Sequence, residues 1–112
     1  MEFNRVINGI VKYLNREVIP NMNEWQGFVA RMGTARILNN TDNLKKLLAD
    51  NVYVKTFAIF DEHGNVDIDG LINDLKTAIK DKGYIEFELP MFGKFKFIES
   101  DIDNLHSYIR GA

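Results

Sequence analysis

The sequence predicts an α+β fold, a single small domain of four to five helices packed on one antiparallel β-hairpin at about residues 84–98. Two observations predict it. Apolar residues recur at three- and four-residue spacing through much of residues 1–82, which is typical of amphipathic helices. Residues 84–98 instead alternate between apolar and charged side chains, as half-buried strands do. The 112 residues fit one domain, with a helical part at 1–82 and the hairpin and a terminal helix at 83–112.

The first two helices are predicted by their apolar spacing. Residues 3–19 carry an apolar residue at every third or fourth position, and Pro20 then ends the pattern. Residues 22–38 predict a second helix that contains Gly27 and Gly33. Each glycine weakens a helix by about 1 kcal/mol relative to alanine, so we expect them to mark tight packing against a neighbouring helix.

A short third helix and an ambiguous segment follow. Thr41 or Asp42 is expected to cap a helix that runs through Leu48. Residues 51–60, NVYVKTFAIF, combine strand-favouring side chains with helical spacing, so the pattern leaves both a short helix and an extended connector open.

The stretch FDEHGNVDIDGLINDL, residues 60–75, looks the most like a chemical site. With Asp61 as its first position it imitates the calcium loop of an EF-hand. Val66 stands where that loop requires glycine, and Ile72 stands where it requires a bidentate glutamate. The stretch therefore predicts a turn that leads into a helix, with a cation-binding module as a lesser alternative.

The motif D-I-D-x-L occurs at residues 67–71 and again at 101–105, each time at an expected helix start. Asp67 is predicted to cap the first of these helices, and Ser100, in an S-x-x-D pattern, the second. The sequence leaves open whether the acidic edge that these motifs create binds anything. The edge consists of Asp67, Asp69, Asp101 and Asp103.

The clearest strands are YIEFEL and KFKFI, which PMFG joins. One register pairs Glu86 with Lys96, whereas a slip of two residues places Glu88 opposite Lys96, and both keep the two faces matched. A hairpin alone is barely stable, so we expect its apolar face to be core, packed on helices. The predicted hairpin core consists of Ile85, Phe87, Leu89, Phe95 and Phe97.

The residue types argue against an enzyme. There is no cysteine, and His63 and His106 stand in no recognised nucleophile or metal motif. The glycines form no phosphate-binding pattern. We therefore predict no catalytic residue, cofactor, metal or small-molecule substrate. No apolar run approaches the roughly 20 residues that span a bilayer, so we expect no membrane partner.

Helices followed by a hairpin also resemble a winged helix-turn-helix, with Arg31 and Arg36 on a recognition helix and GKFKF as the wing. The net charge of −2 gives no general attraction to nucleic acid, so a DNA-binding regulator is the alternative function rather than the first.

An apolar stripe on the second helix offers a candidate interaction surface. Trp25, Phe28 and Met32 recur at helical spacing. Such a stripe belongs either to an ordinary monomer core or to a face that is buried against a partner or a second copy.

The patterns GNVDIDGL, KGYIEFELPMFGKFKF and SDIDNLHSYI, within residues 60–110, resemble small uncharacterised proteins of phages and prophages of Gram-positive bacteria. The resemblance implies a virion or a host-cytoplasm setting. Together these observations predict a non-catalytic structural or assembly protein that acts through protein–protein contact, including self-association as a homo-oligomer.

Overall fold

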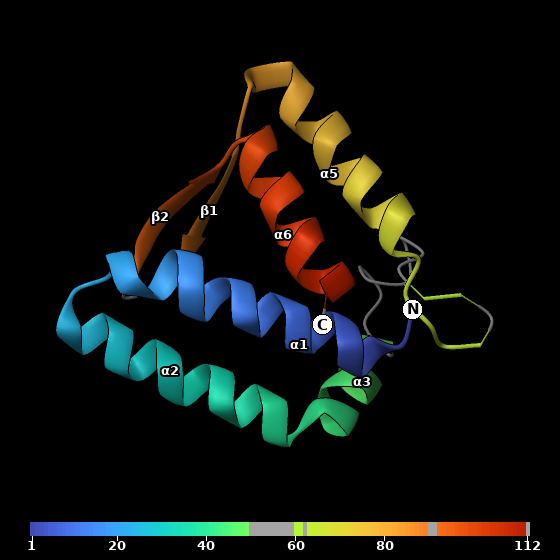
Figure 1. Ribbon diagram of the computed structural model, residues 1–112, viewed down its shortest axis with the longest axis horizontal. Helices are drawn as coiled ribbons and strands as arrows, with labels where there is room; N and C mark the ends of the chain where they lie inside the picture. The colour runs from blue at the N-terminus through green and yellow to red at the C-terminus, as the bar shows by residue number, and fades with distance from the viewer. Residues whose placement is uncertain (50–59, 62, 90–91, 112) are drawn as a thin grey trace.

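The computed structural model describes residues 1–49, 60–61, 63–89 and 92–111 (Figure 1). Within that part five α-helices accompany a two-stranded antiparallel hairpin, which confirms the α+β class. The ambiguous stretch 51–60 lies outside the described residues except for Phe60. The elements in chain order are α1 Phe3–Tyr13, η1 Leu14–Val18, η2 Ile19–Asn21, α2 Glu24–Asn39, α3 Thr41–Ala49, α5 Ile68–Lys82, β1 Ile85–Leu89, β2 Gly93–Phe97 and α6 Glu99–Gly111.

The first helix is the centre of the fold. Figure 1 shows α6 lying across α1 on one side, while α2 runs back along α1 on the other. The crossing of α1 and α6 is close because Gly9 has no side chain and Ile109 packs directly over it. The hydrophobic core between α1, α5 and α6 is aliphatic except for one aromatic ring. It consists of Phe3, Val6, Ile7, Val11, Val66, Ile68, Ile72, Ile79, Ile102 and Ile109.

The helix expected at 3–19 changes geometry along its length. It is α-helical to Tyr13, a π-helix over Leu14–Val18 and a 3-10 helix over Ile19–Asn21. Pro20 lies in the 3-10 turn, where its missing N–H does not interrupt an α-helical ladder. π-helical turns are rare and frequently lie at functional sites.

The turn before α5 is built by aspartates. Phe60 and Val66 form an isolated antiparallel bridge, and the Val66 amide donates to the Met1 carbonyl at 2.8 Å. Asp67 is the N-cap of α5, since its Oδ1 accepts from the Gly70 amide at 3.1 Å. The helix ends at Gly83, whose φ of 83° is left-handed, a conformation that glycine adopts without steric strain.

The start of α6 differs from the prediction in one residue. Ser100 lies inside the first turn of α6, so its expected role as the cap is wrong. Ile98 precedes the helix, and its carbonyl accepts from the Asp101 amide at 3.0 Å. Asp101 Oδ2 in return accepts from the Ile98 amide at 2.9 Å. The carboxylate three residues into the helix, rather than the serine hydroxyl, therefore satisfies the backbone there.

The hairpin adopts the first of the two registers that the alternation allows. Glu86 lies opposite Lys96, and Gly93, with a φ of 86°, lies opposite Leu89. Ile85 and Phe97, which face each other across the strands, pack on the core from one edge. Among the described helices, none has the length and apolar character that a membrane crossing requires.

Candidate protein-interaction surface

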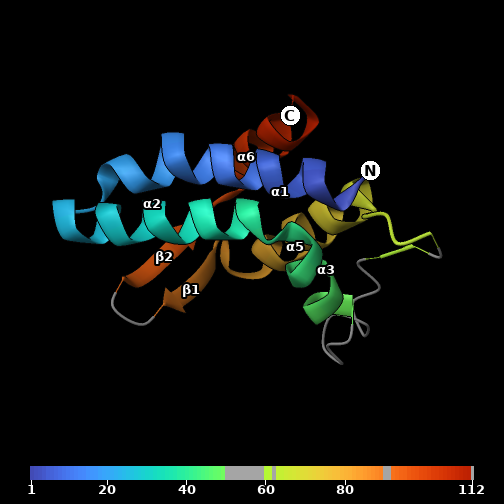
Figure 2. The same cartoon turned by 90° about the horizontal axis from the view of Figure 1, so that it is seen from below.

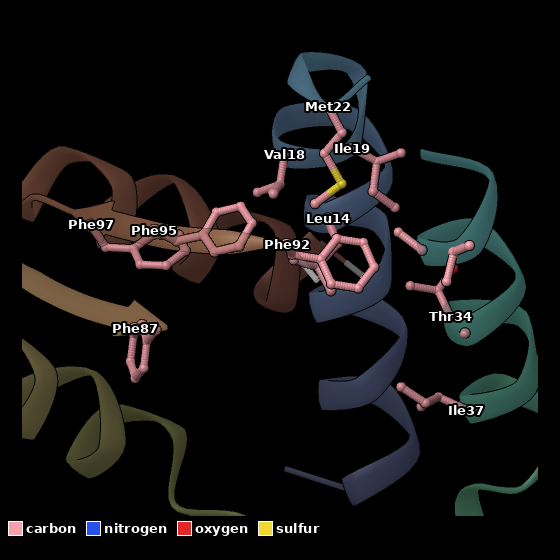
Figure 3. Close-up of a pocket in the computed structure, with 13 residues that line it drawn as sticks. Leu14, Val18, Ile19, Met22, Thr34, Ile37, Phe87, Phe92, Phe95 and Phe97 are labelled. Atoms are coloured by element: carbon pink, nitrogen blue, oxygen red, sulfur yellow. The ribbon is translucent and has the colours of Figure 1, made fainter. Parts of the chain in front are cut away.

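A pocket of about 410 Å³ separates the hairpin from α2, and its floor is the η1–η2 segment (Figure 3). Thr34 is the one lining residue whose side chain carries a polar atom, and its hydroxyl donates to the Arg31 carbonyl at 3.0 Å. The hydroxyl proton of Thr34 is thus already used, and the other lining side chains are apolar. We call it the hairpin pocket. Its lining residues are Leu14, Val18, Ile19, Met22, Val29, Ala30, Gly33, Thr34, Ile37, Phe87, Phe92, Phe95 and Phe97.

Two local features shape this pocket. The π-helical turn holds Leu14 and Val18 at its ends, and both side chains line the pocket. After the 3-10 turn the chain reverses into α2, where Asn23 Oδ1 caps the helix by accepting from the Gln26 amide at 2.8 Å. This reversal sends α2 alongside the preceding helical segment, so that its side chains face the hairpin across the pocket (Figure 3).

The apolar face of the hairpin is less buried than expected. Phe87, Phe95 and Phe97 share one face, as the alternation predicts. However, 47% of Phe87 is exposed, so its assignment to the core is wrong. Phe87 packs edge-on against Phe97, with ring centroids 5.7 Å apart. Phe95 and Phe97 are half-buried, and the Leu89 side chain lies outside the described residues. The face lines an open pocket because none of the described helices covers it completely.

A second apolar surface lies on the outside of α2. Trp25, Phe28 and Met32 are 57%, 62% and 60% exposed. We call these three residues the α2 stripe. The opposite side of the helix buries Gly27 and Thr34, so α2 is apolar on its outer face as well as toward the pocket. Three large apolar side chains gathered on one exposed helix face are uncommon on a monomer surface, which makes the stripe a candidate contact site.

Neither glycine of α2 marks a close helix crossing. Gly27 is buried, and a Cβ there would make ordinary contact with Ile19 Cγ2 at 3.7 Å. A Cβ on Gly33 would meet nothing within 4 Å, because Gly33 faces the hairpin pocket. The prediction of tight packing is therefore wrong for both glycines. The glycine that does mark a close helix crossing is Gly9, which sequence reasoning missed.

The acidic edge is neutralised within the chain. Asp67 and Asp101 accept from backbone amides at the two helix starts. Asp103 pairs with Lys76 at 2.5 Å, and this hydrogen bond raises the pKa of the lysine. Asp69 pairs with Arg110 of α6 and lies 3.6 Å from His106 Nε2. The Asp103 and Asp69 contacts join α5 to α6, while those of Asp67 and Asp101 stabilise the two helix starts, so all four carboxylates have a structural role.

Asp61 has a comparable role in the turn that imitated a calcium loop. Its Oδ1 accepts from the amides of His63 and Asn65, both at 2.9 Å. These bonds, the one from Asn65 first, lower the pKa of the Asp61 carboxyl below its ordinary 3.8. Over the described residues, no three histidine, aspartate or glutamate side chains gather as a metal-binding group. The stretch behaves there as a turn and a helix start.

The basic residues of the hairpin already have partners. Lys94 and Lys96 both approach Glu86, at 3.8 and 4.0 Å, and Lys96 also lies 4.7 Å from the centre of the Tyr84 ring. A DNA-binding wing would use these lysines on phosphates instead. On α2, the stripe places apolar side chains where a recognition helix presents polar ones. These observations give the winged-helix alternative no particular support.

Comparisons of the chain with protein-family models, with curated proteins and with solved structures find no match. The resemblance to phage and prophage proteins therefore stays a prediction. What the surface does has to be argued from its own chemistry, which is apolar, aromatic and divided between a concave pocket and a convex stripe.

Proposed function

We propose that this chain is a non-catalytic assembly protein that acts through protein–protein contact. The observation that carries the proposal is the pair of apolar surfaces on α2, the hairpin pocket on one side and the α2 stripe on the other. Neither surface is closed by the described residues of the chain, although both are built from large side chains.

The composition of these surfaces is typical of binding interfaces. Aromatic residues and methionine are enriched where proteins meet, and aromatic anchors that enter pockets carry much of the binding energy. The four phenylalanines of the hairpin pocket provide such a receptor, and Trp25 provides such an anchor. Of the four aspartates on the acidic edge, Asp69 and Asp103 are paired with Arg110 and Lys76, so the edge is less available to a partner than the apolar surfaces are.

The setting of the function follows from the resemblance to phage and prophage proteins. Small non-catalytic proteins from such genomes are often virion parts or assembly factors, so we place the chain in a virion or in its assembly in the host cytoplasm. This placement is an argument by analogy.

Filling the hairpin pocket tests the proposal. The chain is co-expressed with the product of each gene that flanks its own, and each pair is purified and examined by light scattering. Gly33→Leu adds a side chain where a Cβ meets nothing, so it occupies the pocket without disturbing the helix. Gly33→Ala is the matched control, because it adds the Cβ alone.

We expect the wild type and Gly33→Ala to bind a flanking-gene product, and Gly33→Leu to bind it at least about tenfold more weakly, the equivalent of 1.4 kcal/mol. The proposal fails if neither a flanking-gene product nor a second copy of the chain associates with the folded wild type.

A further inference from the structure

We propose that the α2 stripe binds the same stripe of a second copy, with the two α2 helices antiparallel about a twofold axis beside Phe28. The inference rests on the proposed function, since it takes protein contact as what the chain does and names one partner. In Figure 2 α2 lies at the near side of the molecule, with α1 behind it, so a second helix can approach the stripe.

The spacing of the stripe is symmetric about its middle residue. Trp25 stands three positions before Phe28 and Met32 four positions after it, and each residue is more than half exposed. A twofold axis at Phe28 reverses the second helix, so that Trp25 of each copy meets Met32 of the other within one residue of register. The two Phe28 rings meet at the axis. These positions, i, i+3 and i+7, are the ones that form the seam between paired helices.

The charges beside the stripe favour the same arrangement. Glu24 and Arg31 are seven residues apart, two helical turns, and therefore lie on one flank of the stripe. In an antiparallel twofold pair, this flank of one α2 helix lies against the same flank of the other, so Glu24 of each copy meets Arg31 of the other. Neither side chain forms an ion pair within the part of the chain that the structure describes, so both are available for these contacts.

A parallel pair does not have this complementarity. In that arrangement the flank with Arg31 faces the opposite flank of the partner helix, where Arg36 lies. Two arginines then meet on each side of the axis, and like charges repel. The charges on the two flanks of the stripe therefore select the antiparallel orientation.

The expected dimer is weak and reversible. Each large side chain buries about 150–250 Å² when fully enclosed, and somewhat more than half of that is exposed for each stripe residue. Three residues from each copy then bury roughly 500–900 Å² in total, which is below the size of a standard interface. The contact forms at high local concentration, as in an assembling shell or filament, and it leaves the hairpin pocket open for another partner.

Charge reversal in solution tests the arrangement. Sedimentation equilibrium over a wide range of concentrations is measured for the wild type, for Glu24→Arg, for Arg31→Glu and for the double variant. All substituted residues are exposed, and circular dichroism verifies that each variant is folded. We expect a concentration-dependent dimer for the wild type and a dissociation constant at least about tenfold higher for each single variant, because two attractive pairs become two repulsive ones.

The double variant should recover most of the affinity, since each arginine then meets a glutamate again. An equimolar mixture of the two single variants should form a heterodimer for the same reason. The inference is overturned if the wild type stays monomeric at every concentration, or if the double variant dimerises no better than the single ones.

Gly33→Leu separates this inference from the proposed function. We expect it to leave the dimer unchanged, because Gly33 faces the pocket and not the stripe. A strictly monomeric wild type that still binds a flanking-gene product overturns the self-association alone and leaves the proposed function standing.

Discussion

Replacing Gly9 with alanine should destabilise the fold, although alanine is the better helix former. Gly9 lies in the middle of α1, where α6 crosses it. A Cβ at this position would lie 2.9 Å from the Ile109 nitrogen and nearer still to its Cα, whereas real Cβ atoms are essentially never within 3.0 Å of another heavy atom. The obstruction is backbone, so it cannot be relieved by a change of side-chain rotamer.

Two opposing effects set the magnitude. Gly→Ala inside a helix gains about 1 kcal/mol in propensity. Forcing an extra methyl into a close-packed interface costs about 1–3 kcal/mol, and the upper end applies here because the two helices have to separate. Gly9→Ala should therefore lower the free energy of unfolding by about 1–2 kcal/mol, which for a domain of this size lowers the melting temperature by several degrees.

Gly33→Ala is the matched control, because it makes the same chemical change where a Cβ meets nothing within 4 Å. It should raise the stability by about 0.5–1 kcal/mol. Urea denaturation followed by circular dichroism measures both variants against the wild type. If Gly9→Ala proves as stable as the wild type or more so, the close crossing of α1 and α6 is refuted.

Three further changes test other parts of the structure. Asp67→Ala removes the cap of α5 and should cost about 0.5–2 kcal/mol in urea denaturation, with dimerisation unchanged. Ile109→Ala should lower the free energy of unfolding by about 2–5 kcal/mol, because Ile109 is fully buried. Phe87→Ala should cost less than the roughly 3–5 kcal/mol typical of a buried phenylalanine, because nearly half of Phe87 is exposed. If the two substitutions destabilise the protein equally, Phe87 belongs to the core. Asp61→Ala should lower the melting temperature near neutral pH but not in acid. The folded state lowers the pKa of Asp61, so its carboxylate contributes stability at pH values above its ordinary pKa, and this stability is lost as the pH falls through the lowered pKa. An effect of the substitution that does not depend on pH would contradict this.

The elements that the sequence predicts well are those whose local chemistry agrees with their surroundings. Asp67 and Gly83 mark the two ends of α5 with side-chain and backbone properties that hold in any context. The alternation in the hairpin fixes which residues share a face and excludes a slip of one residue, which would mix the faces. Two matched registers remain, and the structure adopts the one that pairs Glu86 with Lys96. The prediction that Ser100 caps α6 is wrong because Asp101 competes for the same helix start, and a carboxylate is a stronger hydrogen-bond acceptor than a hydroxyl.

The close crossing at Gly9 could not be predicted, because the sequence around a helical glycine does not show which element will pack against it. Gly27, Gly33 and Gly9 all lie in helical patterns, yet one faces η2, one faces a pocket and one faces α6. The same holds for the π-helical turn at Leu14–Val18, whose residues continue the apolar spacing of α1. Tertiary packing, rather than local propensity, decides both features.

The apolar face of the hairpin shows why only part of the candidate surface could be predicted from the sequence. The alternation predicts that Phe87 and Phe95 lie on the same face of the hairpin, but it does not predict whether a helix covers that face. The helix that runs past this side, α2, has an unusual sequence, with apolar residues on several faces and small residues such as Gly33 where a core helix carries large ones. Small residues opposite large rings leave a cavity, while the large residues of α2 point outward instead. Trp25 and Phe28 are therefore exposed for the same reason that the pocket is open, because α2 presents its bulkiest side chains away from its own hairpin.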